Sequence, residues 1–255
     1  MSILTNNGKI FTLSGSVLNY TPPPPTKGDL INMDLDDNGN KTYRVLAISG
    51  NVAKLLGMND ISTSQKYNAR NKIGTFTNGT KGQPYVGSDL DTYLNTTWYN
   101  TLTSTVKAAI VPESRTQCMY RYYNEPNTPN TPTYTYQYQH NWSNSDYENA
   151  DLTDSILIGN QNIFALDLKD IFDYFGKVCI TSNELMELWT NQTSAVSGKY
   201  WWLSSAVALG PGVAWCVDGG GYLGYTGVSN AYAVRPAFNI DLSKISFTKT
   251  TEVIS

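Results

Sequence analysis

Large apolar side chains occupy every second position between residues 213 and 217, where Val213, Trp215 and Val217 alternate with smaller residues. This period of two predicts a strand with one buried face. The remaining side chains are then directed to the opposite face, toward solvent or a ligand. These outward residues are Ala214, Cys216 and Asp218.

Shorter runs of β-forming residues predict further strands. Residues 43–48 and 52–56 are separated by a Ser-Gly-Asn sequence, which predicts a tight hairpin turn. Near the C-terminus, three consecutive glycines lead to a predicted return strand at 222–226 and a final strand at 232–240. Pro236 lies late in that last run and indicates an edge or a bulge there.

Apolar residues recur at helical spacing in four short segments. The first follows Ser88, where a Ser-x-x-Asp sequence predicts a capped helix that runs from about residue 89 into the high 90s. The others are predicted at 103–110, from Asp167 to Gly176, and from Ser182 onward. Together these patterns predict an α+β fold that is rich in loops, with short helices packed on small antiparallel sheets.

Two segments interrupt the periodic patterns. The Pro22–Pro25 run fits neither a helix nor a central strand, so residues 1–27 are predicted to form an N-terminal arm and a stiff connector. Residues 121–154 repeat Tyr, Asn, Thr and Pro with few aliphatic side chains, which predicts an inserted loop or irregular hairpin. We therefore expect one main domain over 28–255 that carries one insertion.

Charge and hydropathy exclude several classes of protein. The chain has 255 residues, with 18 Lys and Arg against 21 Asp and Glu, so binding of nucleic acid through a basic face is not expected. No stretch of about 18 apolar residues is present, and the first thirty residues contain no basic segment followed by an apolar one. We expect a soluble chain with no membrane span and no signal peptide.

Candidate catalytic and metal-binding residues are sparse. Three widely spaced cysteines and a single histidine, His140, argue against a disulfide framework, a zinc site and histidine-dependent catalysis. Glu125-Pro126-Asn127 matches the calcium- and sugar-binding tripeptide of many animal C-type lectins, but the Trp-Asn-Asp triplet that follows in those lectins is absent from the C-terminal strands. Asp34, Asp36 and Asn38 are interpreted as lacking both the Gly and the closing Glu of a calcium loop. We expect no metal and no cofactor.

Several short motifs occur in an order that points to a known family. They include Tyr43-Arg44-Val45-Leu46, Ile163-Phe164-Ala165-Leu166, Trp201-Trp202-Leu203-Ser204-Ser205 and Val234-Arg235-Pro236-Ala237-Phe238. In this order they resemble bacterial and viral proteins with the C-type-lectin fold, and more narrowly the variable proteins that diversity-generating retroelements diversify. The resemblance covers roughly residues 28–242. It implies a C-type-lectin-like domain in which Trp201, Trp202, Trp215 and Arg235 are scaffold.

The resemblance also implies where a ligand binds. In that family, randomised adenines in Asn codons alter exposed residues of the C-terminal region, here 204–233. Such codons exclude Lys, Glu, Gln, Met and Trp, and only Trp215 in this window belongs to that set, where about four such residues are expected from the whole chain. The implied ligand-binding residues are Ala206, Ala208, Gly210, Gly212, Ala214, Cys216, Asp218, Gly220, Gly224, Tyr225, Thr226, Ser229, Asn230, Ala231 and Tyr232.

The implied function is receptor recognition without catalysis, at a virion or cell surface, with a protein or carbohydrate as ligand and an oligomeric state that stays open. Three alternatives remain. The domain could be a lectin-like binding module without diversification, or an inert scaffold whose glycines only form tight turns. It could also be an oxidase of the formylglycine-generating type, whose chemistry depends on cysteine, although no second cysteine lies near Cys216 in the sequence.

Overall fold

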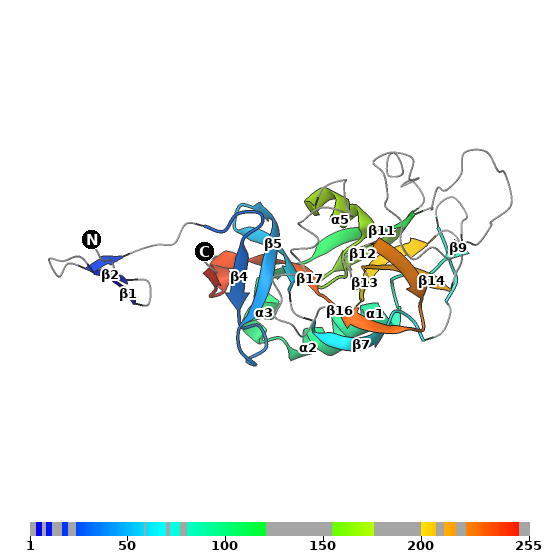
Figure 1. Ribbon diagram of the computed structural model, residues 1–255, viewed down its shortest axis with the longest axis horizontal. Helices are drawn as coiled ribbons and strands as arrows, with labels where there is room; N and C mark the ends of the chain where they lie inside the picture. The colour runs from blue at the N-terminus through cyan, green and yellow to red at the C-terminus, as the bar shows by residue number, and fades with distance from the viewer. Residues whose placement is uncertain are drawn as a thin grey trace.

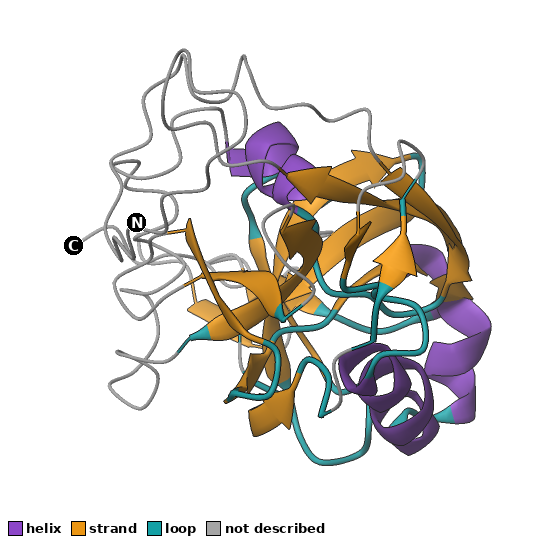
Figure 2. Cartoon of the chain, turned by 90° about the vertical axis from the view of Figure 1, so that its right-hand side faces the viewer, coloured by secondary structure: helices purple, strands orange, loops and turns teal. Residues whose placement is uncertain are grey.

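Strands dominate the computed structural model, which describes residues 4–6, 9–11, 17–19, 24–58, 60–69, 72–76, 81–120, 155–175, 200–207, 212–217 and 223–249. Two large sheets contain most of the strands, and the helices are short. Figure 2 shows the strands at the centre and the helices at the periphery. The α+β prediction is therefore wrong: the fold is mainly β, because strands paired into two large sheets make up most of the described structure, while the few short helices add only a few side chains such as Leu90, Val106 and Ile171 to the cores.

One sheet is antiparallel throughout. Its strand order is β10 (Ile110–Val111), β17 (Ala237–Asp241), β6 (Val52–Gly57), β5 (Lys41–Ser49), β4 (Leu30–Met33) and β18 (Thr248–Lys249). The hairpin predicted from residues 43–56 is confirmed as β5 and β6. In Figure 1 this sheet occupies the end of the domain where β4 and β5 are labelled.

The other large sheet is mixed. It runs in the order β12 (Ser155–Gln161), β11 (Glu113–Tyr120), β13 (Trp201–Val207), β14 (Val213–Val217) and β15 (Leu223–Gly227), while β16 (Ala231–Val234) pairs with β13 and with β7 (Ser62–Lys66). The pairs β11–β13 and β13–β16 are parallel. Smaller antiparallel sheets are formed by β1 (Leu4–Asn6), β2 (Lys9–Phe11) and β3 (Val17–Asn19), and by β8 (Gly74–Thr75) and β9 (Lys81–Gly82).

Helical segments follow the sequence predictions closely where they are described. Ser88 caps α1 (Asp89–Thr92), and its Oγ accepts a hydrogen bond from the Asp91 N–H at 3.1 Å. The helical path continues as a π-helical turn, η1 (Tyr93–Trp98), and α2 (Tyr99–Thr101). The other helices of the described segments are α3 (Ser104–Ala109), α5 (Leu168–Phe175) and the 3₁₀ turn η2 (Leu242–Lys244). The helix predicted from Ser182 and the 121–154 insertion lie outside the described residues.

The final predicted strand, 232–240, is two strands. Arg235 and Pro236 separate β16 from β17, and these two strands belong to different sheets. Pro236 has no N–H to donate, but its carbonyl accepts a hydrogen bond from the Gly57 N–H at 2.8 Å. This short connection therefore joins the two large sheets.

Two hydrophobic cores are in contact with β14. The first core includes Ala214 and Cys216 from one face of the strand, and the second includes Trp215 and Val217 from the other face. The expectation of one buried face is therefore wrong, because neighbouring elements pack on both sides. The scaffold assignment is confirmed, since Trp201, Trp202, Trp215 and Arg235 are each about 1 % exposed.

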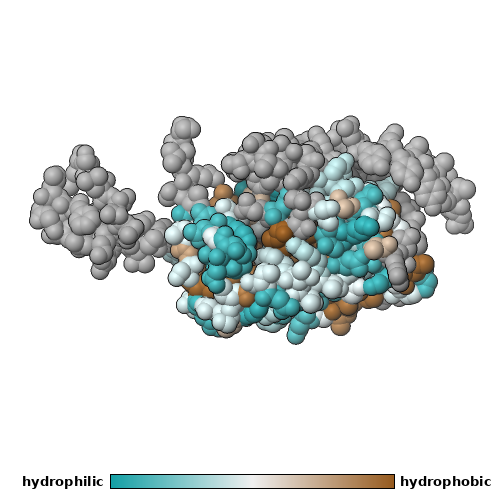
Figure 3. All heavy atoms as spheres, turned by 90° about the horizontal axis from the view of Figure 1, so that it is seen from below, coloured by the Kyte–Doolittle hydropathy of each residue, from teal (hydrophilic) through white to brown (hydrophobic). Residues whose placement is uncertain are grey.

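Among the described residues, no helix is long and apolar enough to cross a membrane. Within the same described segments, the exposed large apolar side chains are Ile48, Ile73, Val86 and Leu157, which lie apart from one another in the sequence. Figure 3 shows a face on which hydrophilic residues surround smaller hydrophobic patches. Isolated apolar residues of this kind need no ligand to explain them.

Candidate functional site

Four of the predicted ligand-binding residues are buried. Ala206, Ala214 and Cys216 are at most 1 % exposed, and Thr226 is 9 % exposed. In the sheet, Ala214 pairs with Ala206 on β13 and with Thr226 on β15, and its side chain belongs to the first core. Ala206, Ala214 and Cys216 are therefore not available to a ligand, because a central strand covered on both faces has no outward side.

The other predicted residues fall into two groups. Ala208, Gly210, Asp218 and Gly220 lie outside the described residues. The turn after β15 is at the surface, with three exposed residues and four half-buried neighbours. The exposed residues are Ser229, Asn230 and Ala231, and the half-buried ones are Gly212, Gly224, Tyr225 and Tyr232.

Four side chains beside this turn form a surface that we call the tyrosine face, comprising Tyr200, Thr226, Asn230 and Tyr232. The Tyr232 ring stacks on Tyr200 with a centroid distance of 4.8 Å and an interplanar angle of 21°. The Tyr232 and Thr226 hydroxyl groups are 3.1 Å apart, and the Asn230 amide donates to Thr226 Oγ1 at 2.8 Å. Stacking and hydrogen bonding thus fix the orientation of Tyr232.

Backbone pairing holds the tyrosine face in place. The Ala233 N–H donates to the Tyr200 carbonyl at 2.8 Å, which sets the two tyrosines side by side, and the Asn230 N–H donates to the Gly227 carbonyl at 2.9 Å. Beneath them, the Trp202 ring lies 4.9 Å from the Tyr232 ring. Sequence reasoning missed Tyr200, because it precedes the 204–233 window, although its position next to Trp201-Trp202 could have indicated it.

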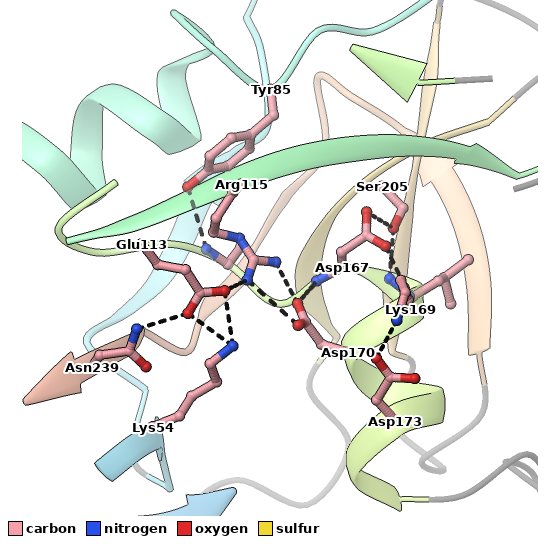
Figure 4. Close-up of polar contacts among 12 residues, drawn as sticks. Lys54, Tyr85, Glu113, Arg115, Asp167, Lys169, Asp170, Asp173, Ser205 and Asn239 are labelled. Carbon is pink, nitrogen blue, oxygen red and sulfur yellow. Dashed lines mark hydrogen bonds and ion pairs between the residues drawn. The ribbon is translucent and has the colours of Figure 1, made fainter. Parts of the chain in front are cut away.

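The structure contains a second polar site, which the sequence analysis did not predict. A pocket of about 250 Å³ is lined by residues of β6, β11 and α5 and by the residues that flank them (Figure 4). We call it the charged pocket. Its lining residues are Lys54, Glu113, Ser114, Arg115, Thr116, Asp167, Lys169, Asp170, Asp173 and Tyr174.

Glu113 is the centre of an ion-pair network in the charged pocket. Its carboxylate is 2.8 Å from Lys54 Nζ and 2.9 Å from a terminal nitrogen of Arg115, and it accepts a hydrogen bond from Asn239 Nδ2 at 2.7 Å. Arg115 also pairs with Asp170 and lies 4.0 Å from the centre of the Phe164 ring. Figure 4 shows these groups converging from separate elements.

Mutual pairing keeps this network ionised. Burial alone would raise the pKa of Glu113, but the hydrogen bond from Lys54 and the charge of Arg115 lower it overall. Burial alone would lower the pKa of Lys54, but hydrogen bonds with Glu113 and Tyr174 raise it. The pKa of Arg115 is likewise raised, because Asp170 and Glu113 outweigh desolvation.

The start of α5 is built into the same pocket. Asp167 accepts hydrogen bonds from the Lys169 N–H at 2.8 Å and from Ser205 Oγ at 2.9 Å, while Asp170 accepts one from the Asp167 N–H at 2.7 Å. Two carboxylates therefore satisfy N–H groups that the first helical turn leaves without partners. The prediction that Asp167 begins a helix is confirmed to within one residue.

No group of three or more His, Cys, Asp or Glu side chains in the described part of the chain is arranged to hold a metal ion. The turn at 34–39 does contain the glycine of a calcium loop, Gly39, with φ of +91°. However, Lys41 Nζ lies 2.6 Å from the Asp36 carboxylate. The lysine ammonium group therefore occupies the position from which a calcium ion would approach this carboxylate. The tripeptide at 125–127 that matches the calcium-binding motif of lectins lies outside the described residues.

Comparison with known proteins places the chain in a family but does not assign an activity. No curated protein and no solved structure matches it. Residues 54–242 match the family described as "Domain of unknown function (DUF6273)", and this range includes both the tyrosine face and the charged pocket. Because the match extends over well more than half of the sequence, the chain belongs to the DUF6273 family.

Proposed function

We propose that this protein is a binding module that recognises a protein or carbohydrate ligand on a cell surface through the tyrosine face and the adjoining turn. The observation that supports this function is the combination of an exposed segment, Ser229 to Ala231, with two stacked tyrosines, Tyr200 just before β13 and Tyr232 on β16. Placement of the molecule at a virion or cell surface belongs to the same proposal.

Physical chemistry favours such a surface for recognition. Tyrosine offers a large rigid contact area at low cost in conformational entropy, and asparagine offers adaptable hydrogen bonds, as in antibody loops. Here the strands hold the backbone, and the Thr226, Asn230 and Tyr232 side chains are already hydrogen-bonded to one another. A ligand therefore meets groups that are ordered before it binds, which reduces the entropy lost on binding.

The alternative of a cysteine-dependent oxidase is less well supported. Cys216 is 1 % exposed and belongs to the first core. Reactive cysteines normally occupy partly exposed, electropositive surroundings that stabilise the thiolate. Trp202 and Val234 are members of the same hydrophobic cluster, which favours a structural role for Cys216.

We also propose diversification by a retroelement, and the exposure of each side chain indicates which positions could be diversified. Randomised residues are tolerated where side chains are exposed, so Ser229, Asn230 and Ala231 are suitable positions. Replacement of the buried Ala206 or Ala214 would disturb the core. The nucleotide sequence tests this point: a reverse-transcriptase gene and a near-copy repeat with adenine-specific differences are expected beside the gene, and their absence would leave a binding module without diversification.

Binding measurements test the function itself. The full chain is labelled and applied to a glycan microarray and to a panel of bacterial cells, together with Ala231→Arg and the control Thr248→Arg. Both substitutions add the same side chain at an exposed position, but Thr248 lies on β18 of the other large sheet. We expect Ala231→Arg alone to reduce binding, by about tenfold or more. Equal binding by all three proteins, or no binding to any glycan or cell, would contradict the proposal.

A further inference from the structure

The charged pocket presents hydrogen-bonding groups of both signs around a small volume. Lys54, Arg115 and Lys169 carry positive charge, and four carboxylates carry negative charge, from Glu113, Asp167, Asp170 and Asp173. Its volume of about 250 Å³ is below the range of about 300–1,000 Å³ that is usual for drug-sized ligands. A ligand of this pocket is therefore small.

The existing ion pairs select against a charged ligand. Lys54 pairs with Glu113, Arg115 with Glu113 and Asp170, and Lys169 with Asp173. An anion would have to approach four carboxylates, and a cation would have to approach three basic groups. A neutral hydroxyl group avoids both penalties, because it can donate to a carboxylate and accept from an ammonium or guanidinium group.

Two further groups favour a ligand over an inert network. Arg115 is 6 % exposed, and its Nε has no hydrogen-bond partner among the described residues, so a buried donor remains unsatisfied in a residue that lines the pocket. The half-buried ring of Tyr174 also lines the pocket and supplies apolar surface. Aromatic rings beside polar groups suit the C–H and O–H groups of a sugar ring.

We propose that the charged pocket binds a neutral polyhydroxylated ligand, specifically a single monosaccharide unit. The hydroxyl groups exchange hydrogen bonds with the carboxylates and basic groups, while Tyr174 contacts the ring carbons. This site is separate from the tyrosine face, since it is built from β6, β11 and α5 and shares no residue with that face. The inference therefore does not depend on the proposed function.

Titration of the full chain tests this inference. The probes are methyl α-D-mannoside, methyl β-D-glucoside, methyl β-D-galactoside, N-acetylglucosamine and, separately, inorganic phosphate, with binding followed by saturation-transfer NMR and calorimetry. We expect at least one saccharide to bind, and Lys169→Ala and Tyr174→Ala to weaken it by about tenfold or more. Circular dichroism and thermal unfolding verify that each variant is folded.

Matched controls separate this site from others. Lys244→Ala removes a lysine that is 56 % exposed like Lys169 and that pairs with a nearby carboxylate, Asp241, but that lies outside the charged pocket, so it is expected to leave saccharide affinity unchanged. Thr248→Arg, at an exposed position on β18, is also expected to leave it unchanged. Loss of sugar binding in Ala231→Arg but not in Lys169→Ala would place the sugar at the tyrosine face and overturn the pocket inference. Binding of phosphate alone, or of no probe, would overturn it as well.

Discussion

Because β14 is buried on both faces, we expect a large substitution at Ala214 to destabilise the protein. This side chain has no exposed surface, and the strands on either side bring Ala206 and Thr226 next to it. In Ala214→Tyr, a phenol ring has to enter the close-packed first core. If the face were exposed, as the alternation in the sequence predicts, the same substitution would change stability very little.

The typical cost of overpacking a protein core gives the expected size of the loss in stability. Inserting extra methylene groups into a packed core typically costs 1–3 kcal/mol, and a whole ring is larger, so we expect a loss of about 3 kcal/mol or more for Ala214→Tyr. Ala231→Tyr makes the same chemical change at an exposed position and should alter stability by less than about 0.5 kcal/mol. For a chain of this size, about 3 kcal/mol corresponds to a decrease in Tm of roughly 6–12 °C.

Thermal unfolding followed by tryptophan fluorescence and far-ultraviolet circular dichroism measures this difference. Cys216→Asn provides a second test if Ala214→Tyr does not fold, because a buried amide without partners costs about 1–3 kcal/mol. An Ala214→Tyr variant with the Tm of the unaltered protein would refute the reasoning, and would restore Ala214 as a surface residue.

Three further results are expected from other parts of the structure. Because the pKa of Glu113 is lower in the folded chain, its stabilising contribution is present above about pH 4.5 and is lost as the pH falls further. Glu113→Gln should therefore lower the free energy of unfolding by about 1–3 kcal/mol at pH 7, and the difference in Tm between the two proteins should be smaller at pH 3. Gly57→Ala would place a Cβ 2.8 Å from Pro236 Cδ, so urea unfolding should show a loss of about 1–3 kcal/mol, and an unchanged midpoint would contradict the close approach. Because Lys41 occupies the Asp36 carboxylate, Tm should be equal in calcium and in chelator, and an increase of several degrees with calcium would show that the turn binds this ion.

Local patterns in the sequence were sufficient to predict local secondary structure. The β5–β6 hairpin, the capped helix after Ser88 and the start of α5 all depend on residues within a few positions of one another. Turn sequences and cap residues act through their own backbone hydrogen bonds, so their effect does not require knowledge of the rest of the fold.

Long-range packing explains what the sequence did not show. The period of two in 213–217 correctly indicated a strand, but small residues at alternate positions can face either solvent or a second core, and only the arrangement of neighbouring elements decides between them. The charged pocket was missed for a related reason, since Lys54, Glu113 and Asp170 come from three distant segments. Each of them alone is an ordinary charged residue.

The motifs that were most distinctive in the sequence have structural roles, and this limits what a family resemblance says about function. Trp201 and Trp202 are buried, and Arg235 is 1 % exposed, beside Asp60 at 3.4 Å and over the Trp201 ring. Arg235 also begins the connection between the two large sheets. Replacement of such a residue disrupts the fold whatever the ligand, whereas the exposed residues Ser229 to Ala231 can vary without that cost. Under the proposed binding function, we therefore expect ligand specificity to depend on the exposed residues Ser229 to Ala231 and not on the buried motifs.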